Sequence, residues 1–319
     1  MHMPRLAAFT VAALLCGTAA LAQQATVKLS YIVDHPAIDA AREGVIAALK
    51  EGGFTDGDTM ALEVQSAQGA MTTQVQINEK FVGESPDLIV AISTPTAQTA
   101  MAATKDIPIV FAAVTDPLAA GLVDSYEKPG RNLTGSSDMT PIDQHLALIT
   151  RILPEVKRIG VIYNGGEANS IAQVEVIHAE AEKAGLDVVE ATATQSSGVG
   201  DAAASLVGKA DAIYVPTDST VVSAIESVVK VGEDADLPVF AADTSSVERG
   251  AIAALGFDYF DIGHAAGMKA VEILKGADPA TLPVVFIDKL DLYVNPTSAR
   301  KMGVTLPDDL MAEAAKVGE

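Results

Sequence analysis

The stretch Leu88-Ile89-Val90-Ala91-Ile92-Ser93-Thr94-Pro95-Thr96 sets the fold of this chain. Its first five residues form an apolar, β-branched run that predicts a buried strand. Thr94 is a good helix N-cap and Pro95 suits the first helical position, so we expect a helix over residues 95–104. A buried strand that leads through a short polar turn into a helix is the repeating unit of parallel α/β sheets.

The same unit recurs from Val27 onward. Strands are predicted at 28–33, 60–64, 88–92, 107–112, 159–163, 187–190, 212–215, 238–241 and 251–255. Helices are predicted between them, at 36–50, 72–82, 95–104, 142–152, 170–183, 220–231, 245–250 and 262–274. This strict alternation favours parallel sheets covered by helices on both faces, with right-handed crossovers.

Two windings of this kind are separated by a segment with the composition of a domain boundary. Residues 129–141 are rich in Gly, Ser, Asn and Pro. The helix and the apolar run 284–287 that follow Gly256 are surplus to a complete second domain, so we expect the chain to return to the first. The sequence thus predicts two doubly wound lobes joined by a three-strand hinge. Lobe I is predicted at 23–137 plus 257–288, and lobe II at 138–256 plus 289–319. Such lobes can close on a cleft.

The charge balance excludes some partners. The 319 residues carry 21 Lys and Arg against 42 Asp and Glu, a formal net charge of −21. Association with nucleic acid or with an anionic membrane surface would begin with long-range repulsion. We therefore expect a small or basic partner and no nucleic acid.

The first 22 residues have the pattern of a cleaved signal peptide. Arg5 precedes an apolar run, and Ala20-Leu21-Ala22 has the small-x-small form that signal peptidase accepts. The run is too short to span a membrane, so we expect an exported, periplasmic protein. The alternative is a lipoprotein anchored through Cys16, the single cysteine, but the bulky Leu15 precedes it where small residues are expected.

Candidate binding residues lie just after the predicted strands, because ligands of open parallel sheets bind at the carboxyl ends of the strands. At Thr94-Pro95-Thr96, the free amides of Thr96 and Ala97 at a helix N-terminus would suit a carboxylate. An ordinary helix cap with nothing bound is the alternative reading.

Acidic residues follow three other strands. Asp116, Asp218 and Asp243 would face one cleft, where clustered carboxylates favour a cation such as a ligand ammonium. Each could instead cap its own helix or turn. From the second lobe, the loop residues Asn164, Glu167, Asn169 and Ser170 could complete the site, or they could only cap the helix that follows.

Signatures of enzymes are mostly absent from the sequence. The histidines at 35, 145, 178 and 264 have no metal-binding spacing, and there is no G-x-S-x-G elbow or Walker A loop. Gly198-Val199-Gly200 lacks the third glycine of a dinucleotide fingerprint. Paired carboxylates for glycoside chemistry stay open, since such pairing is spatial. We expect a non-enzymatic protein without cofactor or metal.

Five motifs in register resemble the TrpX-like family of ABC transporter substrate-binding proteins, whose better-known members bind aromatic amino acids. They are Asp34-His35-Pro36-Ala37-Ile38-Asp39, Ser93-Thr94-Pro95-Thr96-Ala97-Gln98, Ile109-Val110-Phe111-Ala112-Ala113-Val114-Thr115-Asp116-Pro117, Gly130-Arg131-Asn132-Leu133-Thr134-Gly135 and Pro216-Thr217-Asp218-Ser219. The resemblance implies a type I periplasmic binding fold, capture of a ligand between two lobes, and delivery to a membrane permease driven by an ATPase. We expect a monomer.

The resemblance also implies roles for the candidate residues. Ser93, Thr94 and Thr96 would hold a carboxylate, and Asp116, Asp218 and Asp243 are candidates for the ammonium. The aromatic candidates are Tyr163 and Tyr259, and the set of expected ligand-binding residues is completed by Asp34, Asn164, Glu167, Asn169, Ser170 and Thr217. Aromatic residues make up only 4% of the chain and Trp is absent, so a smaller amino acid or related zwitterion stays open beside an aromatic one.

Two other functions remain open. A sensor partner that presents ligand to a membrane receptor would use the same fold and cleft. A secreted hydrolase or transferase would use the acids as general acid and base, but no set of residues favours it.

Overall fold

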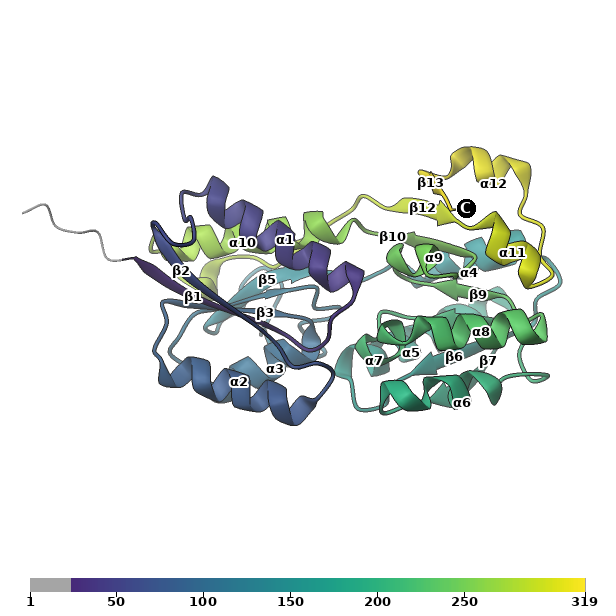
Figure 1. Cartoon of the computed structure of the whole chain (residues 1–319), viewed down its shortest axis with the longest axis horizontal. Helices are drawn as coiled ribbons and strands as arrows, with labels where there is room; N and C mark the ends of the chain where they lie inside the picture. Colours follow the sequence, from purple (N-terminus) through teal and green to yellow (C-terminus); the bar gives the residue numbers. More distant parts are fainter. Residues whose placement is uncertain (1–23, 319) are drawn as a thin grey trace, which may run out of the picture.

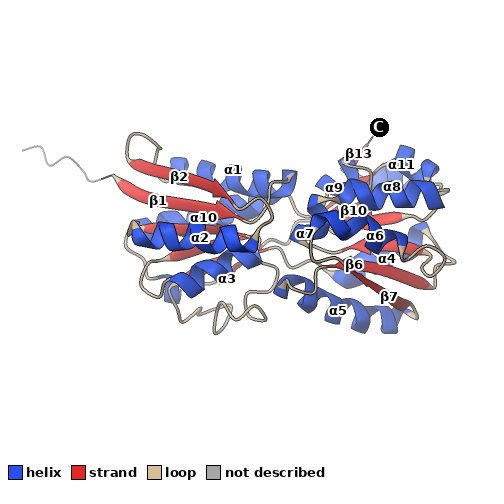
Figure 2. Ribbon diagram, turned by 60° about the horizontal axis from the view of Figure 1, so that its bottom comes forward, coloured by secondary structure: helices blue, strands red, loops and turns tan. Residues whose placement is uncertain are grey.

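Two α/β lobes lie next to each other along the long axis of the molecule (Figure 1). This computed structural model describes residues 24–318, so the predicted signal peptide and Cys16 lie outside the described residues. Helices cover both faces of each sheet (Figure 2). The prediction of two doubly wound α/β lobes is confirmed.

Lobe I is built on a six-stranded parallel sheet of order β11-β5-β4-β3-β1-β2. Its strands are β1 (Ala25–Tyr31), β2 (Met60–Ser66), β3 (Leu88–Ile92), β4 (Ile109–Ala112), β5 (Leu133–Ser137) and β11 (Val285–Phe286). Its helices are α1 (Pro36–Glu51), α2 (Met71–Gly83), α3 (Thr94–Ala103) and α10 (Tyr259–Leu274), with the 3₁₀ turn η2 (Pro279–Thr281).

The alternation of β3 side chains explains why lobe I has two cores. Leu88, Val90 and Ile92 pack in the cluster with α1 and α10, whereas Ile89 and Ala91 pack in the cluster with α2 and α3. All five residues of β3 are buried, as expected for a central strand of a covered parallel sheet.

Lobe II has a seven-stranded sheet of order β13-β12-β10-β9-β8-β6-β7. Its strands are β6 (Arg158–Tyr163), β7 (Asp187–Thr192), β8 (Ala212–Val215), β9 (Val239–Ala241), β10 (Ala253–Gly256), β12 (Asp291–Val294) and β13 (Lys316–Val317). Its helices are α4 (Ile142–Ile152), α5 (Ala168–Ala184), α6 (Val199–Ala204), α7 (Ser219–Ser223), α8 (Ile225–Ala235), α9 (Ser245–Glu248), α11 (Pro296–Lys301) and α12 (Asp308–Glu313), with the 3₁₀ turn η1 (Ser196–Gly198).

The chain passes between the lobes three times: between β5 and α4, between β10 and α10, and between β11 and β12 (Figure 1). The residue boundaries expected from the sequence stay a prediction. After the third crossing the chain enters lobe II without a crossover helix, and β12 pairs with β10 antiparallel. The sheet of lobe II is therefore mixed, not purely parallel.

Two of the differences from the sequence prediction have local reasons. The helix expected at 220–231 is two helices, α7 and α8, which meet at Ala224. The strand β5 lies within residues 129–141, whose Gly, Ser, Asn and Pro content predicts a domain boundary. It is nevertheless fully buried, since the hydroxyls of Thr134 and Ser136 donate to the carbonyls of Leu282 and Ile262.

No helix within residues 24–318 combines the length and apolar character needed to cross a membrane.

Candidate functional site

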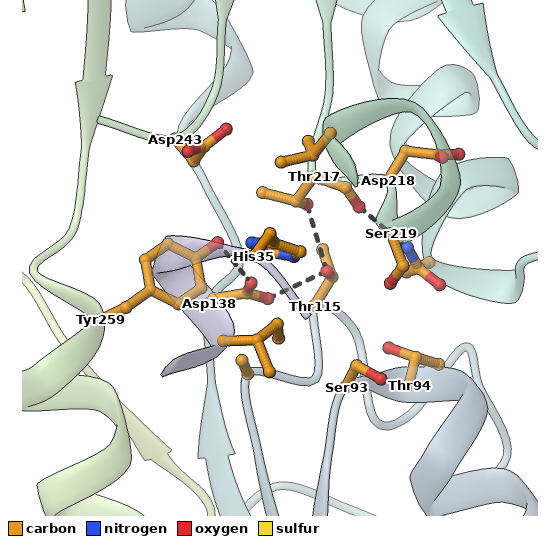
Figure 3. Close-up of a pocket in the computed structure, with 14 residues that line it drawn as sticks. His35, Ser93, Thr94, Thr115, Asp138, Thr217, Asp218, Ser219, Asp243 and Tyr259 are labelled. Atoms are coloured by element: carbon orange, nitrogen blue, oxygen red, sulfur yellow. Dashed lines mark hydrogen bonds between the residues drawn. The ribbon is translucent and has the colours of Figure 1, made fainter. Parts of the chain in front are cut away.

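A small cavity lies between the carboxyl ends of the two sheets (Figure 3). Both lobes contribute to its lining, which is mostly small and polar. The lining residues are His35, Ile38, Ser93, Thr94, Ala113, Thr115, Asp138, Asn169, Thr217, Asp218, Ser219, Val222, Asp243 and Tyr259. Seven of these were among the residues predicted from the sequence: Ser93, Thr94, Asn169, Thr217, Asp218, Asp243 and Tyr259.

The turn between β3 and α3 places two hydroxyls at the cavity. Ser93 has a φ of 82°, which turns the chain sharply out of the strand, and α3 begins at Thr94. Thr94 is therefore the first helical residue and Ser93 is the cap, one position earlier than predicted. The side chain of Thr94 is 2% exposed, and its Oγ1 has no hydrogen-bond partner within residues 24–318.

The predicted free amides at this helix need a correction. The amide of Ala97 donates to the carbonyl of Ser93 over 3.0 Å, so it is not available to a ligand. The hydroxyl of Thr96 lies 3.2 Å from the Ser93 hydroxyl and 3.4 Å from Oε1 of Gln74, and Thr96 does not line the cavity. Thr96 thus contacts the Ser93 side chain without lining the cavity itself.

Asp218 is a helix cap that also lines the cavity. Its Oδ1 accepts from the amide of Val221 over 2.8 Å, which caps α7. Its Oδ2 accepts from the amide of Asn164 over 2.6 Å and from the hydroxyl of Ser170 over 2.5 Å. Burial and the nearby Glu167 carboxylate raise the pKa of Asp218 to about 7.

Glu167 holds the two loops of lobe II together behind the cavity. Its carboxylate accepts from the amides of Ser219 and Thr220, each over 3.1 Å, and from the Thr220 hydroxyl over 2.7 Å. Neither Glu167 nor its loop neighbours Asn164 and Ser170 line the cavity. Their role in the structure is to fix Asp218 and the start of α7.

Asn169 is the member of this loop that reaches the cavity. Its Nδ2 donates to the carbonyl of Thr217 over 2.8 Å. Its side chain is 5% exposed, and its Oδ1 has no hydrogen-bond partner in the described chain. A buried acceptor without a partner is costly, so this oxygen is suited to a donor on a ligand.

Asp243 caps α9 with both carboxylate oxygens. Oδ1 accepts from the hydroxyl of Ser245 over 2.5 Å and from the amide of Ser246 over 3.0 Å, and Oδ2 accepts from the Ser246 hydroxyl over 2.6 Å. The carboxylate is thus held by its own lobe.

Asp138 was not predicted, and it lies at the first crossing between the lobes. Its Oδ1 accepts from the hydroxyl of Thr115 over 2.9 Å and its Oδ2 from the hydroxyl of Tyr259 over 2.8 Å (Figure 3). Thr115 in turn lies 3.3 Å from the Thr217 hydroxyl of lobe II. Burial raises the pKa of Asp138. The sequence signal for Asp138 was its place after β5, a strand that composition alone did not reveal.

His35 and the apolar residues complete the lining. Burial lowers the pKa of His35 to about 4, so its imidazole is neutral near pH 7. Its Nδ1 has no partner within residues 24–318. Ile38 and Val222 supply apolar surface from opposite lobes.

Three further predicted residues, besides Thr96, Asn164, Glu167 and Ser170, lie outside the cavity because other groups hold their side chains. Asp34 accepts from the hydroxyls of Tyr31 over 3.0 Å and Ser66 over 2.8 Å. Asp116 accepts from the amides of Leu118 and Ala119 and from the Tyr126 hydroxyl, which makes it a turn cap. Tyr163 donates to Glu190 over 2.5 Å. Asp116 therefore does not join Asp218 and Asp243 at one cavity.

The charge of the cavity suits a zwitterion. Three carboxylates line it, and none of the lining residues is Lys or Arg. This arrangement favours an ammonium and disfavours a simple anion. The hydroxyls of Ser93 and Thr94 can donate to a carboxylate on the same ligand. Within residues 24–318, no group of three or more His, Cys, Asp or Glu residues is placed to hold a metal ion.

Comparisons with known proteins agree with this geometry. A family model described as ABC transporter substrate binding protein matches residues 26–318. A curated relative from Clostridioides difficile (strain R20291), named tyrosine-binding protein, is 45% identical over 273 residues, which cover 86% of this chain and 79% of the relative.

Two solved structures differ in how well they superpose on this chain. The ABC domain from Streptococcus pneumonia in complex with L-Trp is 36% identical with a TM-score of 0.89, and the match covers 92% of this chain and 99% of that chain. The ligand-free, open structure of a substrate-binding protein with adhesive properties from Clostridium difficile is 42% identical with a TM-score of 0.69, and the match covers 92% of this chain and 99% of that chain. Of these two, the more identical chain superposes less well on this one.

Proposed function

The chain belongs to the family of ABC transporter substrate-binding proteins, and we propose that it captures an aromatic amino acid between its lobes for delivery to a membrane permease. Proteins of this family are ligand-binding components of transporters, not enzymes, and they work outside the cytoplasm. The proposal goes beyond membership of the family, because it names the class of ligand and its delivery to a permease.

The observation that carries the proposal is that hydroxyl donors and carboxylates line the same cavity between the lobes. Ser93 and Thr94 of lobe I offer hydroxyl donors, while Asp138, Asp218 and Asp243 offer carboxylates, and no lining residue carries a Lys or Arg charge. A free amino acid presents the complementary pair, a carboxylate and an ammonium. A ligand that touches both lobes stabilises the closed arrangement more than the open one, which is the basis of capture.

The aromatic class is favoured by the relatives and by the apolar part of the lining. The names of two relatives give tyrosine and L-Trp as what those proteins bind. In this chain Ile38, Val222 and Tyr259 line the cavity and can pack against an aromatic ring.

Isothermal titration calorimetry with L-tyrosine, L-tryptophan and L-phenylalanine tests the ligand class. Tyramine, which lacks the carboxylate, and 3-(4-hydroxyphenyl)propanoate, which lacks the ammonium, separate the two polar contacts. We expect binding of at least one aromatic amino acid, with each truncated analogue roughly 10- to 100-fold weaker. Glu127→Gln, an exposed substitution away from the cavity, is the matched control and should bind as the wild type does. Failure of all three amino acids to bind would overturn the proposal.

Export through a cleaved signal peptide is the second part of the proposal. It rests on the charged start, the apolar run and the Ala20-Leu21-Ala22 site in the sequence. The intact mass of the mature protein from the producing cell tests it. A chain that begins at Gln23 supports a periplasmic protein, whereas a lipid-modified chain that begins at Cys16 would replace this proposal with a lipoprotein anchor.

A further inference from the structure

We propose that Asp138 is the residue that binds the ammonium group of the ligand, and that Asp218 and Asp243 line the cavity mainly as caps of their own helices. This inference rests on the proposed function and assigns one of its two polar contacts. It differs from the sequence prediction, which placed the ammonium at Asp116, Asp218 or Asp243.

The hydrogen bonds of Asp218 and Asp243 leave them little capacity for a ligand. Each carboxylate accepts three hydrogen bonds, and in each the donors belong to lobe II. In both, backbone amides at a helix N-terminus take part, through Val221 for Asp218 and through Ser246 for Asp243. Two carboxylate oxygens offer about four lone-pair positions, so three of them are already used.

Asp138 accepts no hydrogen bond from the backbone amide of another residue, and it has no charged partner in the described chain. Each of its oxygens accepts one hydrogen bond from another side chain, and both donors are neutral hydroxyls. The residue is 3% exposed, and no ion pair to it occurs within residues 24–318. A buried carboxylate with no cation nearby is unfavourable, which is why burial raises its pKa. A ligand ammonium would supply the missing charge and favour the ionised form.

Other unpartnered groups in the same cavity point to a polar ligand. Oγ1 of Thr94 and Oδ1 of Asn169 are buried and have no hydrogen-bond partner in the described chain. They come from opposite lobes. A zwitterion whose ammonium lies at Asp138 and whose carboxylate lies toward Ser93 and Thr94 can supply partners to this cavity.

The position of Asp138 connects ligand recognition to closure. Tyr259 begins α10 just after the second crossing, and Asp138 lies on the first crossing. The hydrogen bonds therefore run from Tyr259 through Asp138 and Thr115 to Thr217 of lobe II (Figure 3). An ammonium bound at Asp138 interacts with groups from both lobes and from the hinge, so its binding favours the closed arrangement.

A cycle of one substitution and one ligand change tests the assignment. The proteins are the wild type and Asp138→Asn, and the ligands are the tightest aromatic amino acid and its analogue without the amino group. Asparagine keeps the size of the side chain, and the hydroxyls of Thr115 and Tyr259 can reorient to accept from its amide. We expect Asp138→Asn to weaken binding of the amino acid roughly 10- to 100-fold. The affinity for the analogue should change by less than about threefold.

Asp218→Asn and Asp243→Asn are the matched controls for the same cycle. If any of these acids has a purely structural role, its substitution should weaken the binding of both ligands equally. Equal losses for Asp138→Asn, or a selective loss of the amino acid only in one of the two controls, would overturn the assignment. Should Asp138→Asn unfold, Asp138→Ser takes its place, with the same ratio of affinities as the readout. If the wild type binds no amino acid, the proposed function itself fails, and that result is distinct from a failed cycle.

Discussion

The Oγ1 atoms of Thr115 and Thr217 lie 3.3 Å apart, although the two residues follow strands of different lobes. Thr115 comes after β4 of lobe I and Thr217 after β8 of lobe II. Each strand ends at the cavity, so this contact closes the cleft at its centre. It is the kind of contact that exists only while the lobes are together.

Replacing Thr217 by valine should therefore weaken ligand binding, because it makes the closed arrangement of the lobes less stable. Valine keeps the shape of threonine and removes one hydrogen bond between the lobes, a loss of about 1 kcal/mol or roughly fivefold in affinity. The change should appear mainly as faster dissociation, measured by stopped-flow fluorescence or surface plasmon resonance. Thr305→Val, an exposed substitution in lobe II, is the control. An unchanged dissociation rate would show that the contact does not hold the lobes together.

The neighbouring threonines at the start of α3 should respond differently to substitution. The Thr94 hydroxyl is buried at the cavity without a partner, so Thr94→Val should leave the melting temperature of the ligand-free protein unchanged or higher. The same change should weaken binding of the amino acid by roughly tenfold. Binding of an analogue without the carboxylate should be weakened much less.

Thr96→Val gives the contrasting result from the same helix turn. The Thr96 hydroxyl interacts with Ser93 and Gln74, and it lies behind the cavity. Its loss should destabilise the protein by about 1 kcal/mol without discriminating between ligands with and without a carboxylate. Thermal unfolding and calorimetry on both variants provide the comparison. Suppose instead that only Thr96→Val loses affinity tenfold, and only for ligands with a carboxylate. Thr96 and not Thr94 would then be the residue that contacts the carboxylate.

Most of the fold was predictable because the signal lay in the strands themselves. The runs at 88–92 and 212–215 are apolar throughout, and the structure places β3 and β8 at these residues. The segment 133–137 is different, because Thr134, Gly135 and Ser136 make it polar in composition. Its burial depends on hydroxyl contacts with residues more than 120 positions away and on the close approach of Gly135 to the Phe111 carbonyl. No local pattern encodes such contacts.

The site was predictable to the extent that strand ends identify it. Asp218 and Asp243 follow β8 and β9 and reach the cavity as expected. Asp116 follows β4 in the same way, but the next turn offers its own amides to the carboxylate. Asp138 was missed together with β5. Sequence position thus identifies the edge of the sheet, but it does not decide which side chain lines the cavity, since Asp116, Asp218 and Asp243 all accept from amides of the segment that follows them.

The packing of α1 against α10 should tolerate no side chain at Gly263. A Cβ there would lie 1.9 Å from the carbonyl oxygen of Ala41, so the two helices would have to separate. Gly263→Ala should destabilise lobe I by about 3 kcal/mol.

Gly83→Ala is the matched control, because Gly83 is the last residue of α2 and a Cβ there meets no atom within 4 Å. That substitution should be neutral or stabilise the protein by up to about 1 kcal/mol. Urea unfolding of both variants measures the difference. Equal stabilities would mean that α1 and α10 can move apart at no cost.

His145 should make the stability of lobe II depend on pH. It is buried on α4, its Nδ1 lies 2.6 Å from the Tyr214 hydroxyl, and burial lowers its pKa to about 4. Because the pKa in the unfolded chain is about 6.5, protons bind preferentially to the unfolded state below that value. The stability that the neutral imidazole contributes is therefore complete above pH 6.5 and is lost as the pH falls towards 4.

The comparison of wild type with His145→Gln isolates this effect, since the other titrating groups are common to both proteins. From pH 7 to pH 5, the free energy of unfolding of the wild type should fall by about 2 kcal/mol relative to the variant. Tyr214→Phe separates the causes, because it removes the hydroxyl and leaves the imidazole buried. We expect it to keep the pH dependence of the wild type. A stability difference between wild type and His145→Gln that stays constant with pH would show that the imidazole gains access to water in the folded protein.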